Sequence, residues 1–138
     1  MNVKEVWGNE DFNEMSWHDN YIYKMSFPSD DLRMSLEIDY IFKWELNPKS
    51  NFYQYWISHC WLTFVDVLNL KIDLDYKNST GLTIAEIRRI SNRISKNQKV
   101  IIWTFEIETD KGMISFDATG FIQKVDKQPV LSQSQRLE

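Results

Sequence analysis

Cysteine and histidine are scarce in this 138-residue chain, and their scarcity excludes two kinds of structure. The single cysteine, Cys60, has no partner for an internal disulfide, so a small fold held together by disulfides is excluded. With only two histidines in addition, the chain lacks the ligands for a His- or Cys-rich structural zinc site. We therefore expect a fold stabilised by its own hydrophobic core, with no cofactor.

Glycine and proline are scarce too, with four and three residues, and no Gly-, Ser- or Pro-rich linker divides the chain. The sequence therefore predicts a single domain over residues 17–126. It would be preceded by a polar N-terminal segment, 1–16, and followed by a polar C-terminal tail, 127–138.

Long apolar runs and an excess of positive charge are also missing. The 16 basic and 20 acidic residues give a net charge of −4, which provides no overall attraction to nucleic acid or to an anionic membrane. No run is long enough to span a bilayer, and residues 1–20 do not have the pattern of a signal peptide. We expect a cytoplasmic protein that binds neither nucleic acid nor membranes.

Aromatic residues are abundant, and alternation of apolar and polar residues dominates the middle of the chain. Hydrophobic residues make up 43% of the chain, enough to form a core at this length. Residues 33–46 alternate with a period of two, which predicts a strand with one buried face and one polar face. Strands are also predicted in residues 21–27, 52–57, 61–67, 68–76, 100–108 and 113–118.

Residues 83–95 allow two interpretations. Thr83 and Glu86 have the spacing of a helix capping box, and Ile84 and Ile87 recur at helical spacing. The same isoleucine-rich stretch also fits a short strand. We favour the helix, so the predicted fold class is α+β: a β-rich single domain, mainly antiparallel sheet with one or two short helices.

Each histidine is followed by a residue that invites a catalytic interpretation. His18-Asp19 is a pair found in metal phosphohydrolases, but the further ligands are missing, so we favour a loop in which Asp19 or Asn20 bonds to the backbone. His59 and Cys60 would point to opposite faces of a strand, which predicts a buried core thiol and no nucleophile. No phosphate-binding loop, nucleophile elbow or dinucleotide motif is present, so we nominate no catalytic residue.

Four carboxylates lie on the polar faces of two predicted strands, Glu37 and Asp39 on one and Asp73 and Asp75 on the other. If the strands were neighbours, these groups could converge on calcium or magnesium or act as an acid–base pair. We favour a solvated face with lysines as cross-strand partners, and therefore no metal site.

Aromatic residues crowd residues 44–64, and at positions 52, 53, 55 and 56 they must face both sides of a strand. We expect most of them in the core and the remainder in an exposed binding patch. The candidate binding residues are Trp17, His18, Asp19, Tyr53, Tyr55 and Trp56.

Three phrases occur together: Trp17-His18-Asp19-Asn20, Leu36-Glu37-Ile38-Asp39-Tyr40-Ile41 and Trp103-Thr104-Phe105-Glu106. In them the chain resembles a family of small bacterial proteins of unknown function with an HDN start and an LDIDYI strand, where Glu37 replaces an aspartate. The resemblance implies one compact domain from a bacterium. A more remote likeness links residues 17–19 and the following strand to the immunity protein 50 group of polymorphic-toxin systems, which implies binding and blocking of a cognate toxin.

Together these features predict a non-enzymatic protein-binding module, of the immunity type in its narrower form. Its partner would be an unidentified protein or a second copy of the chain. The alternative is a small-ligand or divalent-cation-binding domain, with a hydrolase as one version. It would use His18, Asp19 and the strand carboxylates.

Overall fold

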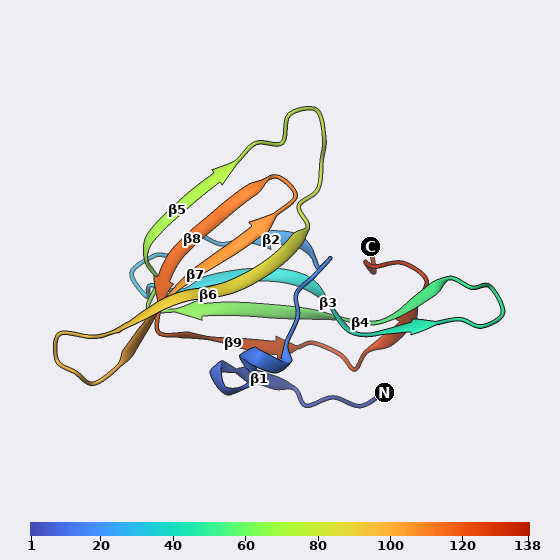
Figure 1. Ribbon diagram of the computed structural model, residues 1–138, viewed down its shortest axis with the longest axis horizontal. Coiled ribbons are helices and arrows are strands. Elements are labelled where there is room, and N and C mark those ends of the chain that lie inside the picture. The colour runs from blue at the N-terminus through green and yellow to red at the C-terminus, as the bar shows by residue number, and fades with distance from the viewer.

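The computed structural model describes all 138 residues and shows two antiparallel β-sheets stacked on each other (Figure 1). The larger sheet has six strands in the order β1-β9-β4-β3-β2, with β10 also paired to β4. The smaller sheet has four strands in the order β5-β8-β7-β6. The prediction of a β-rich, antiparallel domain is therefore confirmed.

The strand bounds complete this description. The larger sheet contains β1 (Val6–Gly8), β2 (Tyr21–Met25), β3 (Met34–Leu46), β4 (Tyr53–Val65), β9 (Gly120–Val125) and β10 (Val130–Ser132). The smaller sheet contains β5 (Leu68–Leu74), β6 (Ile84–Ile94), β7 (Ile101–Thr109) and β8 (Gly112–Ala118). The helical content is one 3-10 helix, η1 (Asn9–Glu14), which has neither the length nor the apolar character to cross a membrane.

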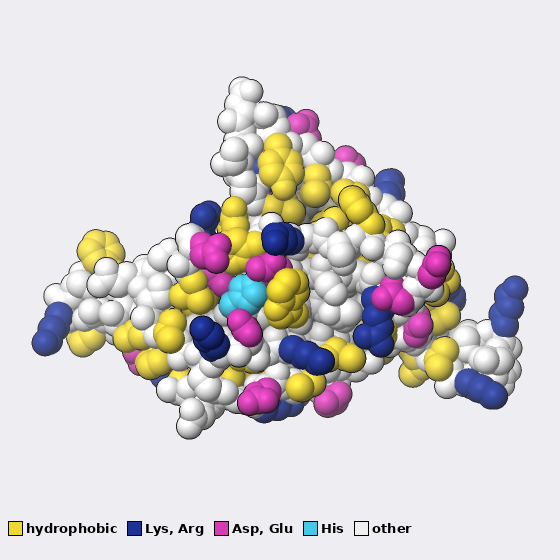
Figure 2. All heavy atoms as spheres, turned by 180° about the vertical axis from the view of Figure 1, so that it is seen from behind, with side chains coloured by type: hydrophobic (Ala, Val, Ile, Leu, Met, Phe, Trp, Pro, Cys, Tyr) yellow, Lys and Arg dark blue, Asp and Glu magenta, His cyan; other side chains and the backbone are white.

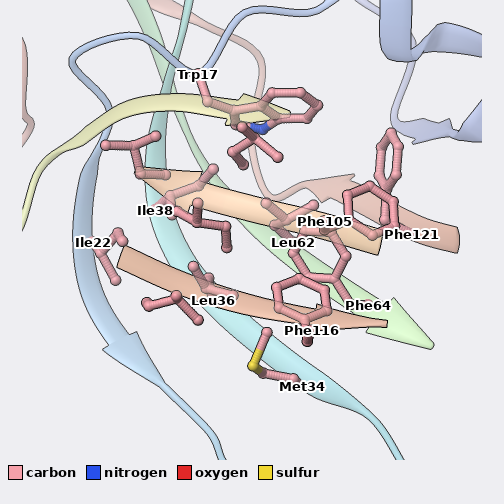
Figure 3. Packing of buried hydrophobic residues seen from close by; sticks show 14 of the residues in the cluster. Trp17, Ile22, Met34, Leu36, Ile38, Leu62, Phe64, Phe105, Phe116 and Phe121 are labelled. Atoms are coloured by element: carbon pink, nitrogen blue, oxygen red, sulfur yellow. The ribbon is translucent and has the colours of Figure 1, made fainter. Parts of the chain in front are cut away.

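One hydrophobic core lies between the sheets and draws side chains from both (Figure 3). At its centre, the Phe64 ring from β4 lies 5.1 Å from that of Phe105 on β7 and 4.7 Å from that of Phe116 on β8. Edge-to-face aromatic pairs at these distances add to the free energy gained by burying the rings. Some of the chain's many aromatic residues therefore form the contact between the two sheets.

The alternation predicted over residues 33–46 is present in β3, but only its first half is buried. Met34, Leu36 and Ile38 are fully buried, whereas Trp44 is exposed. A bulge between Ile41 and Lys43 breaks the register with β4. Past this bulge, β3 and β4 extend beyond the body of the sandwich as a hairpin, at the right of Figure 1.

The helix predicted over residues 83–95 is wrong, because this stretch forms strand β6. At a bulge between Ile84 and Glu86, β6 advances by two residues while its partner β7 advances by one. Ile84 and Ile87 therefore both reach the core although they are three residues apart. The bulge reproduces the spacing expected of a helix, and the Thr83 amide donates to Asp110 instead of starting a helix.

Both ends of the chain, expected as polar segments outside the domain, contribute strands to the larger sheet. β1 pairs with β9, and β10 pairs with the first half of β4, at Tyr55–Ile57. The backbone amide of Val3 donates to Gln128, whose side-chain amide donates back to the Val3 carbonyl, at 2.8 and 3.0 Å. The two ends are thus held to the sheet and to each other.

Candidate functional site

The outer face of β2, β3 and β4 carries a row of polar side chains set by the strand register. Tyr21 lies opposite Asp39, and Asp39 lies opposite His59, so one row crosses three strands. Residues directly opposite in antiparallel strands project to the same side of the sheet. The inner side chains of these strands form the core, so the row faces away from it.

The segment that follows β10 crosses this outer face from β4 towards β2. Its backbone amides donate to side chains of the face: Leu137 to Asp39 Oδ2 at 2.6 Å and Glu138 to the Tyr23 hydroxyl at 3.2 Å. The Arg136 guanidinium lies 4.1 Å from the centre of the Tyr21 ring. The C-terminal segment is therefore bound to the sheet by hydrogen bonds and a cation–π contact.

A pocket of about 420 Å³ remains between this segment, β3 and β4. Most of its lining residues are acidic or polar, and three are apolar. It is lined by Glu37, Asp39, Ile57, Ser58, His59, Asp126, Lys127, Gln128, Val130, Leu137 and Glu138. Its volume lies within the range of about 300–1,000 Å³ that is usual for small-molecule sites.

His59 lies between two carboxylates at this pocket. Its Nε2 is 2.8 Å from Glu37 Oε1, a hydrogen-bond distance, while its Nδ1 is 3.7 Å from Asp126 Oδ2, which is too long for one. An ionised carboxylate only accepts, so we assign the ring proton to Nε2. Seen from behind the view of Figure 1, the molecule presents one histidine bordered by acidic, basic and apolar side chains (Figure 2).

Three polar atoms of the pocket residues are buried without a hydrogen-bond partner: Glu37 Oε2, Asp39 Oδ1 and His59 Nδ1. Asp39 is only 1% exposed. Its Oδ2 accepts hydrogen bonds from the Tyr23 hydroxyl and from the Leu137 amide, whereas its Oδ1 has no partner. Burial, followed by the hydrogen bond to Asp39, raises the pKa of Tyr23, so its hydroxyl stays protonated and donates. Buried polar atoms in native proteins usually have a hydrogen-bond partner, so the three unpaired atoms of Glu37, Asp39 and His59 require an explanation.

A second surface lies on the projecting β3–β4 hairpin, where His18, Trp44, Tyr53 and Tyr55 form what we call the hairpin cluster. The Trp44 ring lies 6.3 Å from His18, 6.1 Å from Tyr53 and 5.0 Å from Tyr55. His18 Nδ1 lies 3.0 Å from the carbonyl of Ala85, which anchors the ring from the other sheet.

The expectation that most aromatic residues of this stretch lie in the core is wrong. Phe52 is 76% exposed, and Trp44, Tyr53 and Trp61 are exposed as well, whereas Phe64 is buried. The hairpin extends past the second sheet (Figure 1), and Trp44, Phe52 and Tyr53 lie outside the core between the sheets.

The candidate binding residues divide between the surface and the interior. His18, Tyr53 and Tyr55 come together in the hairpin cluster, and Trp56, their neighbour on β4, points to the opposite face. Trp17 is 3% exposed and lies in the core, where its indole Nε1 donates to Gln123. Asp19 lies beside the C-terminal segment and accepts from Gln135 at 3.2 Å.

The loop interpretation of residues 17–20 is confirmed. The buried Asn20 accepts from the amide of Ile41 through Oδ1 at 3.4 Å, and its backbone amide donates to the Trp17 carbonyl at 3.0 Å. Asp19 has a φ of 65°, a left-handed conformation that aspartate and asparagine tolerate better than most residues. The motif therefore turns the chain into β2.

The structure does not bring the four strand carboxylates together. Glu37 and Asp39 lie on β3 of the larger sheet, while Asp73 lies on β5 of the smaller sheet and Asp75 just after it. No group of three or more His, Cys, Asp or Glu side chains has an arrangement suited to a metal ion.

Cys60 is a core thiol, as predicted. It is fully buried, and burial raises the pKa of its thiol to about 12. A protonated, inaccessible thiol is a poor nucleophile and a poor metal ligand.

Sequence reasoning missed the pairing of His59 with Glu37 and the approach of Asp126 and the C-terminal segment. The first could have been found by aligning residues 33–46 with 53–65 as a hairpin, because that register places Asp39 opposite His59 and Glu37 diagonal to it on the same face. The other contacts join residues more than 65 positions apart, and no local pattern indicates them.

Comparison with protein-family models, with curated proteins and with solved structures found no match to this chain. Its function is therefore inferred from its own geometry.

Proposed function

We propose that this protein is a non-enzymatic protein-binding module and that the hairpin cluster is its contact surface. The observation that carries the proposal is the exposed position of Trp44 and Tyr53 on a hairpin that extends beyond the core (Figure 1). The Trp44 ring packs against Tyr53, the half-buried Tyr55 and His18. Tyrosine and tryptophan are enriched among the residues that dominate protein–protein binding energies. Their packing against each other restricts their rotamers before any partner arrives, which lowers the entropy lost on binding.

The narrower form of the proposal is an immunity function, in which the partner is a toxin that this protein blocks. It is supported by the likeness of residues 17–19 and the following strand to the immunity protein 50 group. His18 belongs to that motif and is also part of the hairpin cluster.

The test compares capture of proteins from a lysate of the native host by the immobilised wild-type chain and by two variants. Trp44→Ala removes the centre of the hairpin cluster, and Tyr76→Ala removes an exposed aromatic residue after β5, remote in sequence from the hairpin. We expect one stoichiometric partner to be retained by the wild type and by Tyr76→Ala but lost with Trp44→Ala, with both variants folded by circular dichroism.

A partner retained equally by Trp44→Ala would contradict the contact surface. Sedimentation of the purified chain over a range of concentrations covers the case in which the partner is a second copy. Self-association that Trp44→Ala abolishes would identify the cluster as a homodimer face. A retained protein that proves to be a toxin, and is inactivated by the wild type but not by Trp44→Ala, would establish the immunity function.

A further inference from the structure

We infer that the pocket between β3, β4 and the C-terminal segment binds an organic cation with N–H donors, an ammonium or guanidinium group carried on an apolar stem. The inference does not depend on the proposed function, because no residue of the hairpin cluster lines this pocket. It rests on the charge of the wall, on three unpaired atoms and on the shape of the cavity.

The charge of the wall favours a cation. Four acidic residues line the pocket, Glu37, Asp39, Asp126 and Glu138, and the lysine among the lining residues is Lys127. Charges interact more strongly in a partly enclosed site than in bulk water, because the effective dielectric constant is lower there. A positively charged group is therefore attracted to this wall more strongly than to an open surface of the same charge.

The unpaired atoms indicate what the cation must carry. Glu37 Oε2 and Asp39 Oδ1 are acceptors, and His59 Nδ1 is a further acceptor when the ring is neutral. Leaving buried acceptors unpaired is unfavourable, and charge-assisted hydrogen bonds are the strongest that could satisfy them. A primary ammonium group has three donors, and a guanidinium has five.

Asp39 gives the most direct evidence, because it is almost fully buried and still has one oxygen without a partner. Its other oxygen already accepts from the Leu137 backbone amide at 2.6 Å. The carboxylate thus already accepts one nitrogen donor, and Asp39, which lines the pocket, keeps a second oxygen without a partner.

The size and lining of the cavity distinguish an organic cation from a metal ion. A volume of about 420 Å³ is far larger than one ion needs, and no group of three side chains is arranged to ligate one. Ile57, Val130 and Leu137 supply an apolar part of the wall that would contact a hydrocarbon stem. Mostly apolar contact with a few polar groups that fix orientation is typical of small-molecule sites.

The test is a titration of the full chain, followed by amide NMR shifts, with n-butylammonium as the probe. Tetramethylammonium has the same charge but neither an N–H donor nor an apolar stem, so it is the control for attraction to charge alone. Ionic strength is kept constant, and the pH is held at about 8, where an ordinary imidazole is neutral. We expect saturable shifts at Glu37, His59 and Leu137 with n-butylammonium and not with tetramethylammonium.

Two variants remove one pocket carboxylate each, Glu37→Gln and Asp39→Asn, and Asp73→Asn on the other sheet is the control. Each pocket variant is expected to weaken n-butylammonium binding about tenfold or more, the usual effect of losing a charge-assisted hydrogen bond. The control is expected to bind as the wild type does. Glu37 is less buried than Asp39, so Glu37→Gln is less disruptive to the fold. If Asp39→Asn fails to fold, the comparison of Glu37→Gln with Asp73→Asn is sufficient to test the inference.

Three results would overturn the inference. The first is no saturable shift with n-butylammonium over the millimolar range. The second is equal binding of the two cations, which would show attraction to charge without hydrogen bonding. The third is unchanged affinity in the folded pocket variants.

Discussion

The hydrogen bond between Trp17 and Gln123 joins two buried side chains that are 106 residues apart. The indole Nε1 donates to Gln123 Oε1 at 2.8 Å, and the amide nitrogen of Gln123 has no partner. Gln123→Met would leave the indole N–H buried and unpaired, and Trp17→Phe would leave the whole amide unpaired. We expect each change to lower the free energy of unfolding by about 1–3 kcal/mol.

The double variant Trp17→Phe/Gln123→Met removes both polar partners at once. Its destabilisation, measured by urea unfolding, is expected to be clearly smaller than the sum of the two single effects. Additive effects would show that the hydrogen bond does not couple these residues.

Cys60 and Tyr40 make stability sensitive to alkaline pH. Burial raises the pKa of the thiol from 9.0 to about 12 and that of the phenol from 10.0 to about 12. Both groups are neutral when protonated, so above its ordinary pKa each one ionises in the unfolded chain before it does in the folded protein. The free energy of unfolding is therefore expected to be unaffected by these groups below pH 9 and to fall as the pH rises towards 12.

The slope is expected to reach at most about 1.4 kcal/mol per pH unit for each group. Between pH 9 and 10 only the thiol contributes among these two, so Cys60→Ala should flatten the slope there. Chemical unfolding of wild type and variant at several pH values checks this. An unchanged slope in Cys60→Ala would contradict the assignment.

Among the elements, the β7–β8 hairpin depends on a glycine at its turn. Gly112 has a φ of 142°, and a Cβ at this position would lie 2.0 Å from the carbonyl oxygen of Asp73 on β5. Gly112→Ala must therefore strain the backbone and push β5 away from β8. We expect a loss of at least about 2 kcal/mol in the free energy of unfolding.

Gly8→Ala is the control, because Gly8 is extended and its new Cβ would come closest to the end of the flexible Glu10 side chain, at 3.3 Å. The Phe121 carbonyl oxygen, at 3.6 Å, would be at an ordinary van der Waals distance. Thermal melts of both variants check this prediction, and the effect of Gly8→Ala should be much smaller than that of Gly112→Ala. Similar melting temperatures for the two variants would show that the close contact with β5 is relieved at little cost.

Elements differ in how far their sequence predicts them. The first half of β3 is predictable because Met34, Leu36 and Ile38 alternate without interruption and all face the core. β6 is not, because its bulge places Ile84 and Ile87 on one face at helical spacing. Bulges are set by the partner strand and by packing, neither of which leaves a local signal in the sequence.

The same limit applies to the candidate site. The residues of the hairpin cluster were identifiable as aromatic and polar candidates, but their exposure depends on how far the β3–β4 hairpin extends past the second sheet. The pocket depends on residues beyond position 125 that cross the sheet, and the sequence indicated these only as a polar tail. Contacts between distant segments, rather than local propensity, decided both surfaces.

For the whole molecule, the two ends of the chain are expected to differ in importance. Residues 1–14 include β1, which covers the edge of β9, and Phe12, whose ring lies against Trp17, Phe105 and Phe121. Residues 133–138 cross the outer face and contribute no strand. Deleting 1–14 should abolish cooperative thermal unfolding, whereas deleting 133–138 should leave it cooperative.

Circular dichroism melts of both truncated chains make the comparison. A cooperative transition in the chain without 1–14 would mean that the remaining strands form a self-sufficient sandwich. Loss of cooperativity in the chain without 133–138 would mean that the C-terminal segment stabilises the sheet as well as covering it.

The position of β9 between β1 and β4 also has a consequence for synthesis on the ribosome. β1 is translated first, but its partner strand is among the last to emerge, so the larger sheet stays unfinished while most of the polypeptide is being made. During that time one edge of β4 and the whole of β1 are open to pairing with other nascent chains. The larger sheet can therefore be completed only after residues 120–125 have been synthesised, and in a ribosome-bound chain stalled before residue 120 the segment of β1 should remain sensitive to protease.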